Sequence, residues 1–298
     1  MSVKTTIYSQ VNHPQVNHIR SRIIHWLGKI TLNAIAWLIG LLFAIPFYWL
    51  ISSAVKTTKQ IFQMPPVWIP NPVVLNNFVR VFTETEFLNF LKNTLIIALP
   101  VTFGTVLSCA MVGYGFSRIN WKGRDIFFSL SLAMLMLPSM VTLIPVFIIF
   151  RKLEWTGTFK PLIVPAFFGT PYYIFMFRQF FRTIPIELSD SARVDGASEL
   201  EIFFRIYIPL IRPAMAVVAL FTFIGAWGDF LGPLIYINAQ ENYTITLGIY
   251  QMLGNRVTDT DWGIIMAISA ITLLPIVAIF FFAQRTFIEG ISLTGLKG

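Results

Sequence analysis

The chain carries long apolar runs, and these constrain its fold more than any other feature. A helix needs about 20 mainly apolar residues to cross the hydrocarbon core of a bilayer. Runs of this kind lie near residues 31–55, 93–116, 126–150, 161–177, 213–237 and 263–284. They fill most of the 298 residues, of which 56% are hydrophobic and only 12% charged, with a mean hydropathy of +0.71. We therefore predict an all-α integral membrane protein with six transmembrane helices.

The six runs leave no room for a separate soluble domain. We expect an N-terminal segment over residues 1–30, a six-span domain over 31–285 and a C-terminal tail over 286–298. The first run is not a cleaved signal peptide. About 30 residues, rich in polar side chains, precede it, and its apolar core is longer than the roughly 7–15 residues of a signal. The first run is therefore expected to stay in the protein as an anchor.

The fourth run is the least regular of the six. Pro161, Pro165 and Pro171 interrupt it, and Arg178 limits it to roughly 17 residues, the lower limit for crossing a bilayer. Prolines are tolerated in membrane helices when neighbouring groups satisfy the freed carbonyls. We expect this run to cross the membrane, with a re-entrant segment as the alternative.

Lysine and arginine residues are distributed unevenly between the two sides of such a bundle. The side with both termini and the loops after spans two and four receives 14 of the 22 basic residues. Because basic residues concentrate in cytoplasmic loops, we place both termini in the cytoplasm. The net charge of +8 then reflects membrane topology and does not indicate binding to nucleic acid.

The longest cytoplasmic loop, about residues 182–212, has the pattern of a helix, a turn and a second helix. A proline followed by Glu187 suits a first helical turn, where a carboxylate meets the positive end of the helix. Gly196 can adopt the positive φ that commonly ends a helix. Ser198 and Glu201 have the spacing of a capping box, which starts another helix.

We expect the second helix of this loop to expose Phe203 and Phe204. A long, charged and fully patterned loop contrasts with most of the other loops, which are short. We interpret it as a docking surface for a cytoplasmic partner. The alternative is a solvated connector with ordinary helix caps.

The same stretch resembles the cytoplasmic motif of bacterial ABC-importer permeases. That motif reads E-A-A, three residues, Gly, nine residues and I-x-L-P. The corresponding residues are Asp190, Ser191, Ala192, Gly196, Ile206, Ile208 and Pro209. The spacing fits throughout. The replacement of Glu by Asp, Ala by Ser and Leu by Ile keeps the charge sign, the small size and the apolar bulk.

Three further segments resemble carbohydrate-uptake permeases in the same order along the chain. They are Pro46–Pro72, Ala226–Tyr236, with Gly228 in place of an Asn, and Gln284–Gly298. The last resembles the end of the smaller permease of maltose-type importers. By this resemblance the chain is identified as the smaller, six-span permease of a sugar or oligosaccharide importer in the bacterial cytoplasmic (inner) membrane.

The resemblance implies a set of partners. A second, different permease would complete the translocation path, two cytoplasmic ATPase subunits would drive it, and an extracytoplasmic sugar-binding protein would deliver the cargo. The resemblance also implies that ATP and Mg bind to the ATPase subunits, and the absence of a glycine-rich phosphate loop in this chain agrees with it. The residues expected to couple to the ATPase are Asp190, Ser191, Ala192, Asp195, Gly196, Ile206 and Pro209.

Asp229 is the one ionisable residue inside a predicted span. Intramembrane carboxylates are costly and usually face a bundle interior or a wet cavity. One interpretation is that Asp229 lines the translocation path, where Trp227 and Phe230 would offer apolar faces to sugar rings. The alternatives are a structural hydrogen bond for Asp229 and core packing for the aromatic residues.

Two rival functions are open to a chain of this composition. An ion-coupled secondary transporter would also be polytopic, but it should bury several carboxylates or histidines. A membrane-embedded enzyme would need a catalytic set near one face, and the chain shows no catalytic or metal-binding motif and no cofactor site. The external segment 56–90 is expected to contact the binding protein and the partner permease. The cargo itself cannot be deduced from the sequence.

Overall fold

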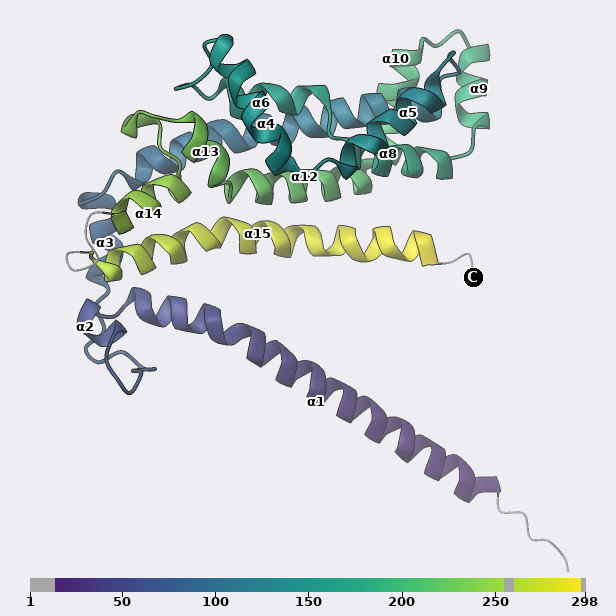
Figure 1. The fold of residues 1–298 in the computed structure, drawn as a ribbon. Helices are drawn as coiled ribbons and strands as arrows, with labels where there is room; N and C mark the ends of the chain where they lie inside the picture. The colour runs from purple at the N-terminus through teal and green to yellow at the C-terminus, as the bar shows by residue number, and fades with distance from the viewer. Residues whose placement is uncertain (1–13, 255–259, 296–298) are drawn as a thin grey trace, which may run out of the picture.

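A computed structural model of the chain describes residues 14–254 and 260–295. Every regular element within these ranges is a helix, which confirms the predicted all-α class (Figure 1). The first elements are α1 (Pro14–Ala54), α2 (Thr58–Ile61), α3 (Asn76–Thr83), α4 (Phe87–Ser117), α5 (Arg124–Ala133), η1 (Met134–Met136), α6 (Ser139–Lys152), α7 (Lys160–Ile163) and η2 (Val164–Phe168). They are followed by α8 (Pro171–Thr183), α9 (Glu187–Val194), α10 (Glu199–Glu201), the π-helix η3 (Ile202–Tyr207), α11 (Ile208–Leu210), α12 (Arg212–Trp227), α13 (Leu231–Tyr236), η4 (Gln240–Asn242), α14 (Ile245–Gly254) and α15 (Trp262–Gly295).

Three helices are each long and apolar enough to cross a membrane. They are α1 from Trp26, α4, and α15 as far as Phe282. Two bent pairs could each form one further span. The unit of α5 and η1 is bent by 104° against α6, and the unit from α10 to α11 is bent by 80° against α12. By length and composition, the described part of the chain therefore offers three to five spans, against the six predicted.

The predicted third span is not a single helix. Leu137 is extended, with a ψ of 118°, and Pro138 follows it. A residue before proline is pushed out of the helical conformation, so the chain changes direction between η1 and α6. The predicted third span, 126–150, therefore consists of two helices with a bend between them.

The predicted fourth span is divided among α7, η2 and the first part of α8. Gly169 has a φ of +86°, which favours glycine, and Thr170 is extended before Pro171. The interruption predicted from the prolines of the 161–177 run is thus present in the structure. Helix α8 begins at the last of these prolines.

The ends of the last two predicted spans also differ from the expectation. Helix α12 ends at Trp227, and three residues separate it from α13, so the predicted fifth span is interrupted at residues 228–230. Helix α15 continues to Gly295, so the predicted tail from residue 286 prolongs the helix for most of its length. Residues 1–13 of the predicted N-terminal segment and 296–298 of the tail lie outside the described residues.

Helix α4 lies at the centre of the packed structure. One buried cluster joins it to α8, α12 and the segment α9–η3, and includes Tyr114, Phe177, Phe181 and Tyr207. A second cluster joins the other half of α4 to α3, α12, α14 and α15, and reaches only the last turns of α1. Figure 1 shows α1 diverging from the remaining helices toward its N-terminal end. The fold is thus a bundle around α4, with α1 largely outside it.

Candidate functional site

The first of the two short charged helices, α9, ends in a Schellman motif. Gly196 has a φ of +83°, and its N–H donates to the carbonyl of Arg193 at 3.0 Å. The N–H of Ala197 donates to the carbonyl of Ala192 at 2.9 Å, which completes the motif. The predicted turn at Gly196 is confirmed. No atom lies within 4 Å of an added Cβ there, so the requirement for glycine comes from the backbone conformation.

The second short helix, α10, begins with the predicted capping box. The Ser198 hydroxyl oxygen accepts the N–H of Glu201 at 3.3 Å, and the Glu201 carboxylate accepts the N–H of Ser198 at 3.0 Å. The helix then widens into the π-helix η3 before α11 leads into α12. π-Helical turns are rare and occur mostly at functional sites.

The residues predicted to couple to an ATPase lie on both sides of this helix pair. The exposed ones are Asp190, Ser191, Asp195, Gly196 and Pro209. Ala192 and Ile206 are half-buried and pack against the cluster around α4. The segment thus has an outer face that is free in this chain and an inner face fixed to the bundle.

The outer face of the helix pair also exposes apolar side chains. Val194 is 88% exposed, Leu200 61% and Phe204 49%. Phe203, which was also expected to be exposed, is buried, because its ring packs 5.3 Å from the ring of Tyr114 on α4. That expectation was wrong for Phe203 and correct for Phe204.

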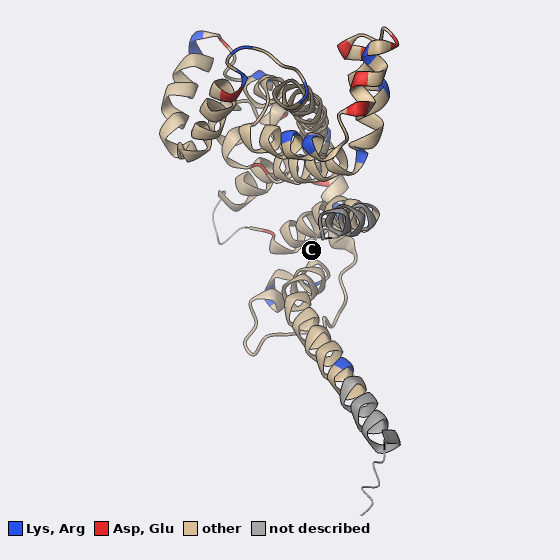
Figure 2. Cartoon of the chain, turned by 90° about the vertical axis from the view of Figure 1, so that its right-hand side faces the viewer, with Lys and Arg blue, Asp and Glu red and all other residues tan. Residues whose placement is uncertain are grey.

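A network of charged groups holds the helix pair together. Arg193 donates from Nη1 to Asp190 and from Nε to Glu199, both at 2.7 Å. The second carboxylate oxygen of Glu199 accepts the hydroxyl of Tyr114 at 2.6 Å. The hydrogen bond from Arg193 is the main reason that the pKa of Glu199 is lowered. The pair projects from the bundle, and acidic and basic residues gather there (Figures 1 and 2).

A cavity of about 470 Å³ lies between α4, α8, α12 and the broken segment α7–η2. Its lining is mixed apolar and hydroxyl-bearing. The polar side chains that line it are Thr105, Thr170, Tyr173, Thr222, Asp229 and Thr244. The Thr222 hydroxyl is buried and has no hydrogen-bond partner among the described residues. A cavity of this chemistry can accept a ligand rich in hydroxyl groups.

Asp229 lies in the break between α12 and α13 and lines this cavity. Its carboxylate accepts the N–H of Gly232 at 3.2 Å, and its carbonyl accepts the hydroxyl of Thr246 at 2.7 Å. The side chain is half-buried. Asp229 thus lines the cavity, as the first interpretation requires, while, among the described residues, its carboxylate bonds within the first turn of α13 and not to a neighbouring helix.

The two aromatic residues beside Asp229 are placed differently. Trp227 is buried, stacks on Phe223 with ring centres 5.5 Å apart, and donates from Nε1 to the carbonyl of Thr272 on α15. Phe230 is half-buried and packs against Tyr250 at 5.0 Å. Neither residue lines the cavity. Their placement matches the core-packing alternative.

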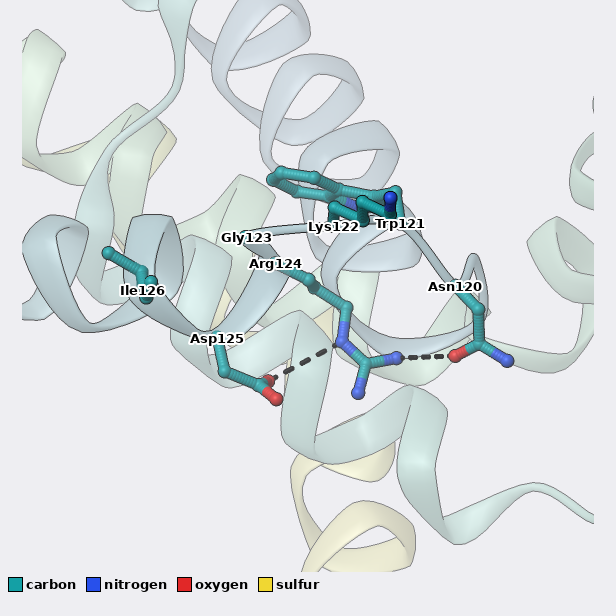
Figure 3. A pocket seen from close by; sticks show the side chains of 7 residues that line it. All are labelled: Asn120, Trp121, Lys122, Gly123, Arg124, Asp125 and Ile126. Carbon is teal, nitrogen blue, oxygen red and sulfur yellow. Dashed lines mark hydrogen bonds and ion pairs between the residues drawn. The ribbon is translucent and has the colours of Figure 1, made fainter.

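A second depression, also about 470 Å³, is formed by the loop between α4 and α5 (Figure 3). Arg124 donates to the side chain of Asn120 at 2.9 Å and pairs with Asp125 at 3.4 Å. One consecutive segment, residues 120–126, supplies the whole lining. Since its polar groups bond mainly to each other, this depression is a weaker candidate than the helix pair or the cavity.

A family model described as "Binding-protein-dependent transport system inner membrane component" matches residues 101–292. The chain belongs to this family. The matched range includes every residue that lines the cavity except Ile97, the charged helix pair, and α15 as far as residue 292. The protein is thus a multi-pass inner membrane permease of a binding-protein-dependent, ATP-driven importer, and this assignment replaces the alternative of an ion-coupled secondary transporter.

Several relatives of this permease match over nearly its full length. The arabinooligosaccharides transport system permease protein AraQ of Halalkalibacterium halodurans is 32% identical, over 93% of this chain and 98% of the relative. The diacetylchitobiose uptake system permease protein DasC of Streptomyces coelicolor is 30% identical, over 91% and 98%. A bacterial ABC transporter involved in alginate import has the same fold, with a TM-score of 0.77 at 19% identity, covering 94% of this chain and 99% of that one.

Sequence reasoning missed several residues at both sites of the permease. Tyr114 and Thr222 lie within apolar runs, where a single hydroxyl gives no distinctive pattern. Arg193 and Glu199 stood out as loop charges, but their pairing with each other and with Tyr114 depends on the fold. In the part of the chain that the structure describes, no group of three or more His, Cys, Asp or Glu side chains could hold a metal ion.

Proposed function

We propose that this permease carries an oligosaccharide, forms half of the translocation path and couples that path to a cytoplasmic ATPase subunit through the helix pair α9–α10. The observation that carries the proposal is the outer face of this pair. Val194 and Leu200 are exposed beside a charged cluster, although the proposed location is outside the lipid. Exposed apolar groups at such a position favour a protein partner.

The proposed topology has six spans, with the third, fourth and fifth broken or bent. Residues 1–30 form a cytoplasmic N-terminal segment, 31–285 the permease domain with the coupling loop at about 182–212, and 286–298 a cytoplasmic end. The distribution of 14 of 22 basic residues supports this orientation. Tyr114, at the end of α4, bonds to the helix pair, and this requires both to lie at the same end of the bundle.

The cavity beside Asp229 is the proposed part of the path. Its hydroxyl groups and one carboxylate suit hydrogen bonding to sugar hydroxyls, and its apolar walls suit the faces of sugar rings. The names of the relatives AraQ and DasC support an oligosaccharide as the class of cargo. Trp227 and Phe230 then support the wall of the path without lining it.

The proposed assembly contains a second, different permease, two ATPase subunits that bind ATP and Mg, and an extracytoplasmic sugar-binding protein. The chain itself is non-catalytic and binds no cofactor in this proposal. The external segment 56–90 would meet the binding protein and the partner permease. A solved alginate importer in complex with a periplasmic protein has a related fold, with a TM-score of 0.59 at 18% identity.

The coupling role is tested by Gly196→Val in the complete complex. A side chain at a φ of +83° costs roughly 1–2 kcal/mol and would redirect α10 relative to α9. We expect normal membrane insertion and pairing with the second permease, but weakened binding of the ATPase subunit or ATP hydrolysis that no longer drives uptake. The measurements are a pull-down of the ATPase subunit and hydrolysis in reconstituted vesicles.

Gly157→Val is the matched control for this experiment. Gly157 has a φ of +81°, no atom near an added Cβ, and a position in the loop between α6 and α7. Both variants strain the backbone to a similar degree, but only Gly196 lies in the proposed docking loop. Equal ATPase binding and coupling in the two variants would mean that the loop is only a connector.

The path role is tested by Asp229→Asn. An asparagine oxygen can still accept the N–H of Gly232, so the cap on α13 is kept while the charge is removed. We expect transport to fall with little change in yield or thermal stability, whereas Asp229→Ala should also lower stability by about 1 kcal/mol. Normal transport by Asp229→Asn would remove this carboxylate from the path.

A further inference from the structure

A continuous chain of polar contacts links helix α4 to the outer tip of the helix pair. The Tyr114 hydroxyl donates to Glu199 at 2.6 Å, Glu199 accepts from Arg193 at 2.7 Å, and Arg193 donates to Asp190 at 2.7 Å. The first contact joins residues 85 positions apart in the sequence. The chain therefore connects a membrane helix to the exposed acidic position of the coupling motif.

The ring of Tyr114 is enclosed by other aromatic rings, so its orientation is restricted. Ring centres of Phe181, Phe203 and Tyr207 lie 5.2–5.7 Å from it. The side chain is only 4% exposed. A buried aromatic cluster of this density fixes the direction of the hydroxyl toward Glu199.

The residue that follows α4 holds the start of the same loop. Arg118 donates from Nη2 to the carbonyls of Phe181 and Ile184, where α8 ends. Its guanidinium also lies over the ring of Tyr207 at 5.3 Å. Glu199 lies in the middle of the 182–212 loop and Ile184 lies near its start, so Tyr114 and Arg118 tie two points of the loop to the C-terminal end of α4.

Helix α4 also reaches the cavity. Thr105 lines the cavity and lies nine residues before Tyr114, which is about 14 Å along a helix. A packed helix moves as a rigid element, so a displacement of the helix pair that shifts the end of α4 also shifts this wall. The hydrogen bond between Tyr114 and Glu199 is the contact that connects the helix pair to α4, and α4 in turn reaches the cavity.

We propose that Tyr114 is a positioning residue that transmits the movement of the coupling helix pair to the cavity, through its hydrogen bond to Glu199. The inference rests on the proposed function, because it requires an ATPase subunit that moves the pair. It assigns a role to a residue of α4 that contacts neither the ATPase nor the cargo. Arg118 serves as a fixed anchor beside it.

The test uses Thr105→Cys as a reporter in the complete complex. The rate of thiol labelling by a small methanethiosulfonate reagent is measured with and without Mg-ATP and vanadate, and labelling of Cys109 in the parent is subtracted. Tyr114→Phe removes the hydroxyl and keeps the ring. We expect the nucleotide-dependent difference in labelling to be lost, while ATPase binding, thermal stability and hydrolysis stay near the parent values.

Tyr207→Phe is the matched control. Tyr207 belongs to the same aromatic cluster and is fully buried, but its hydroxyl has no partner among the described residues. We expect this variant to keep the difference in labelling. Glu199→Gln keeps an acceptor for Tyr114 but loses the charge. It should reduce the nucleotide-dependent difference in labelling rate without abolishing it.

The outcomes separate the two proposals. If the parent complex does not bind the ATPase subunit in a pull-down, the proposed function fails. If it binds and hydrolyses ATP, but Tyr114→Phe keeps the same nucleotide-dependent labelling as Tyr207→Phe, the role of Tyr114 is overturned. An absence of any nucleotide-dependent labelling in an active parent complex would overturn it as well.

Discussion

Helices α1 and α4 have the same hydropathy but opposite surroundings. Over their most apolar windows both have a mean hydropathy of 2.2. None of that window is buried in α1, whereas 39% is buried in α4. Apolarity alone therefore places both helices in the membrane, but it does not decide which one forms the centre of the bundle.

Both helices contain glycines, but the surroundings of these glycines differ. An added Cβ at Gly113 of α4 would lie 2.8 Å from the Cβ of Phe177, and one at Gly104 would lie 2.8 Å from the ring of Phe167. No atom lies within 4 Å of an added Cβ at Gly28 or Gly40 of α1. Small residues let membrane helices approach closely, so α4 packs against α8 and η2 while α1 does not.

The exposed face of α1 carries large apolar side chains. Trp37, Leu38 and Phe43 are each about 70% exposed in this chain. Lipid or the proposed second permease can cover such a surface. The contrast with α4 leads to three predictions, which begin with the largest expected effect.

The strongest test of the contrast is Gly113→Val in α4. The new side chain would meet backbone as well as side chain, since the amide nitrogen of Arg178 is 3.2 Å from an added Cβ. Overpacking typically costs about 1–3 kcal/mol and occasionally more, and contact with backbone leaves little room for relaxation, so we expect a cost at or above the upper end of this range. We expect a clear fall in yield and in the thermal midpoint, measured by size-exclusion chromatography of heated samples in detergent.

Gly115→Val, two residues along the same helix, is the control for this variant. An added Cβ there meets no atom within 4 Å, although the cost of valine in a helix is the same. If both variants lose similar amounts of yield and thermal midpoint, helix propensity, and not close packing with α8, explains the loss.

A smaller effect is expected for Thr94→Val in α4. The Thr94 hydroxyl accepts the N–H of Ile245 at the start of α14, at 3.0 Å, and both groups are buried. Valine keeps the shape but leaves that N–H without its acceptor, which costs about 1–3 kcal/mol. The thermal midpoint should fall, and Thr102→Val, whose hydroxyl bonds only within its own helix, should change it less.

The smallest effect is expected for Gly40→Val in α1. The position is open in this chain, so the isolated permease should keep its thermal midpoint within error. A fall in the thermal midpoint as large as that of Gly113→Val would contradict the contrast in packing between the two helices. A fall in the thermal midpoint that occurs only in the complete complex would instead identify this face of α1 as a contact with another subunit.

The sequence predicted the local features of the molecule well. The capping box at Ser198 and Glu201 and the turn at Gly196 depend on residues within a few positions of each other. Proline positions indicated where helices would be interrupted, as at Pro171. Local backbone preferences act in any surroundings, so they can be deduced from the chain alone.

Features that depend on the neighbours of a helix were not predictable in this way. A membrane helix is apolar on all sides, so its sequence pattern does not show which face will be buried. Phe203 and Phe204 are adjacent and identical in type, yet only Phe203 is buried, because neighbouring helical residues point in different directions and only Phe203 packs against Tyr114. The Trp227 side chain donates a hydrogen bond to Thr272 on α15 and does not line the cavity, which its sequence position also did not reveal.

By itself, the sequence determined that the protein is an all-α membrane permease with a patterned, charged helix pair. The tertiary structure decided that α4 is the centre, that α1 is peripheral, and that Tyr114 meets Glu199. The physical reason is the range of the interactions. Apolarity and helix caps act over a few neighbouring residues, whereas close packing and buried hydrogen bonds join residues that only the folded bundle brings together.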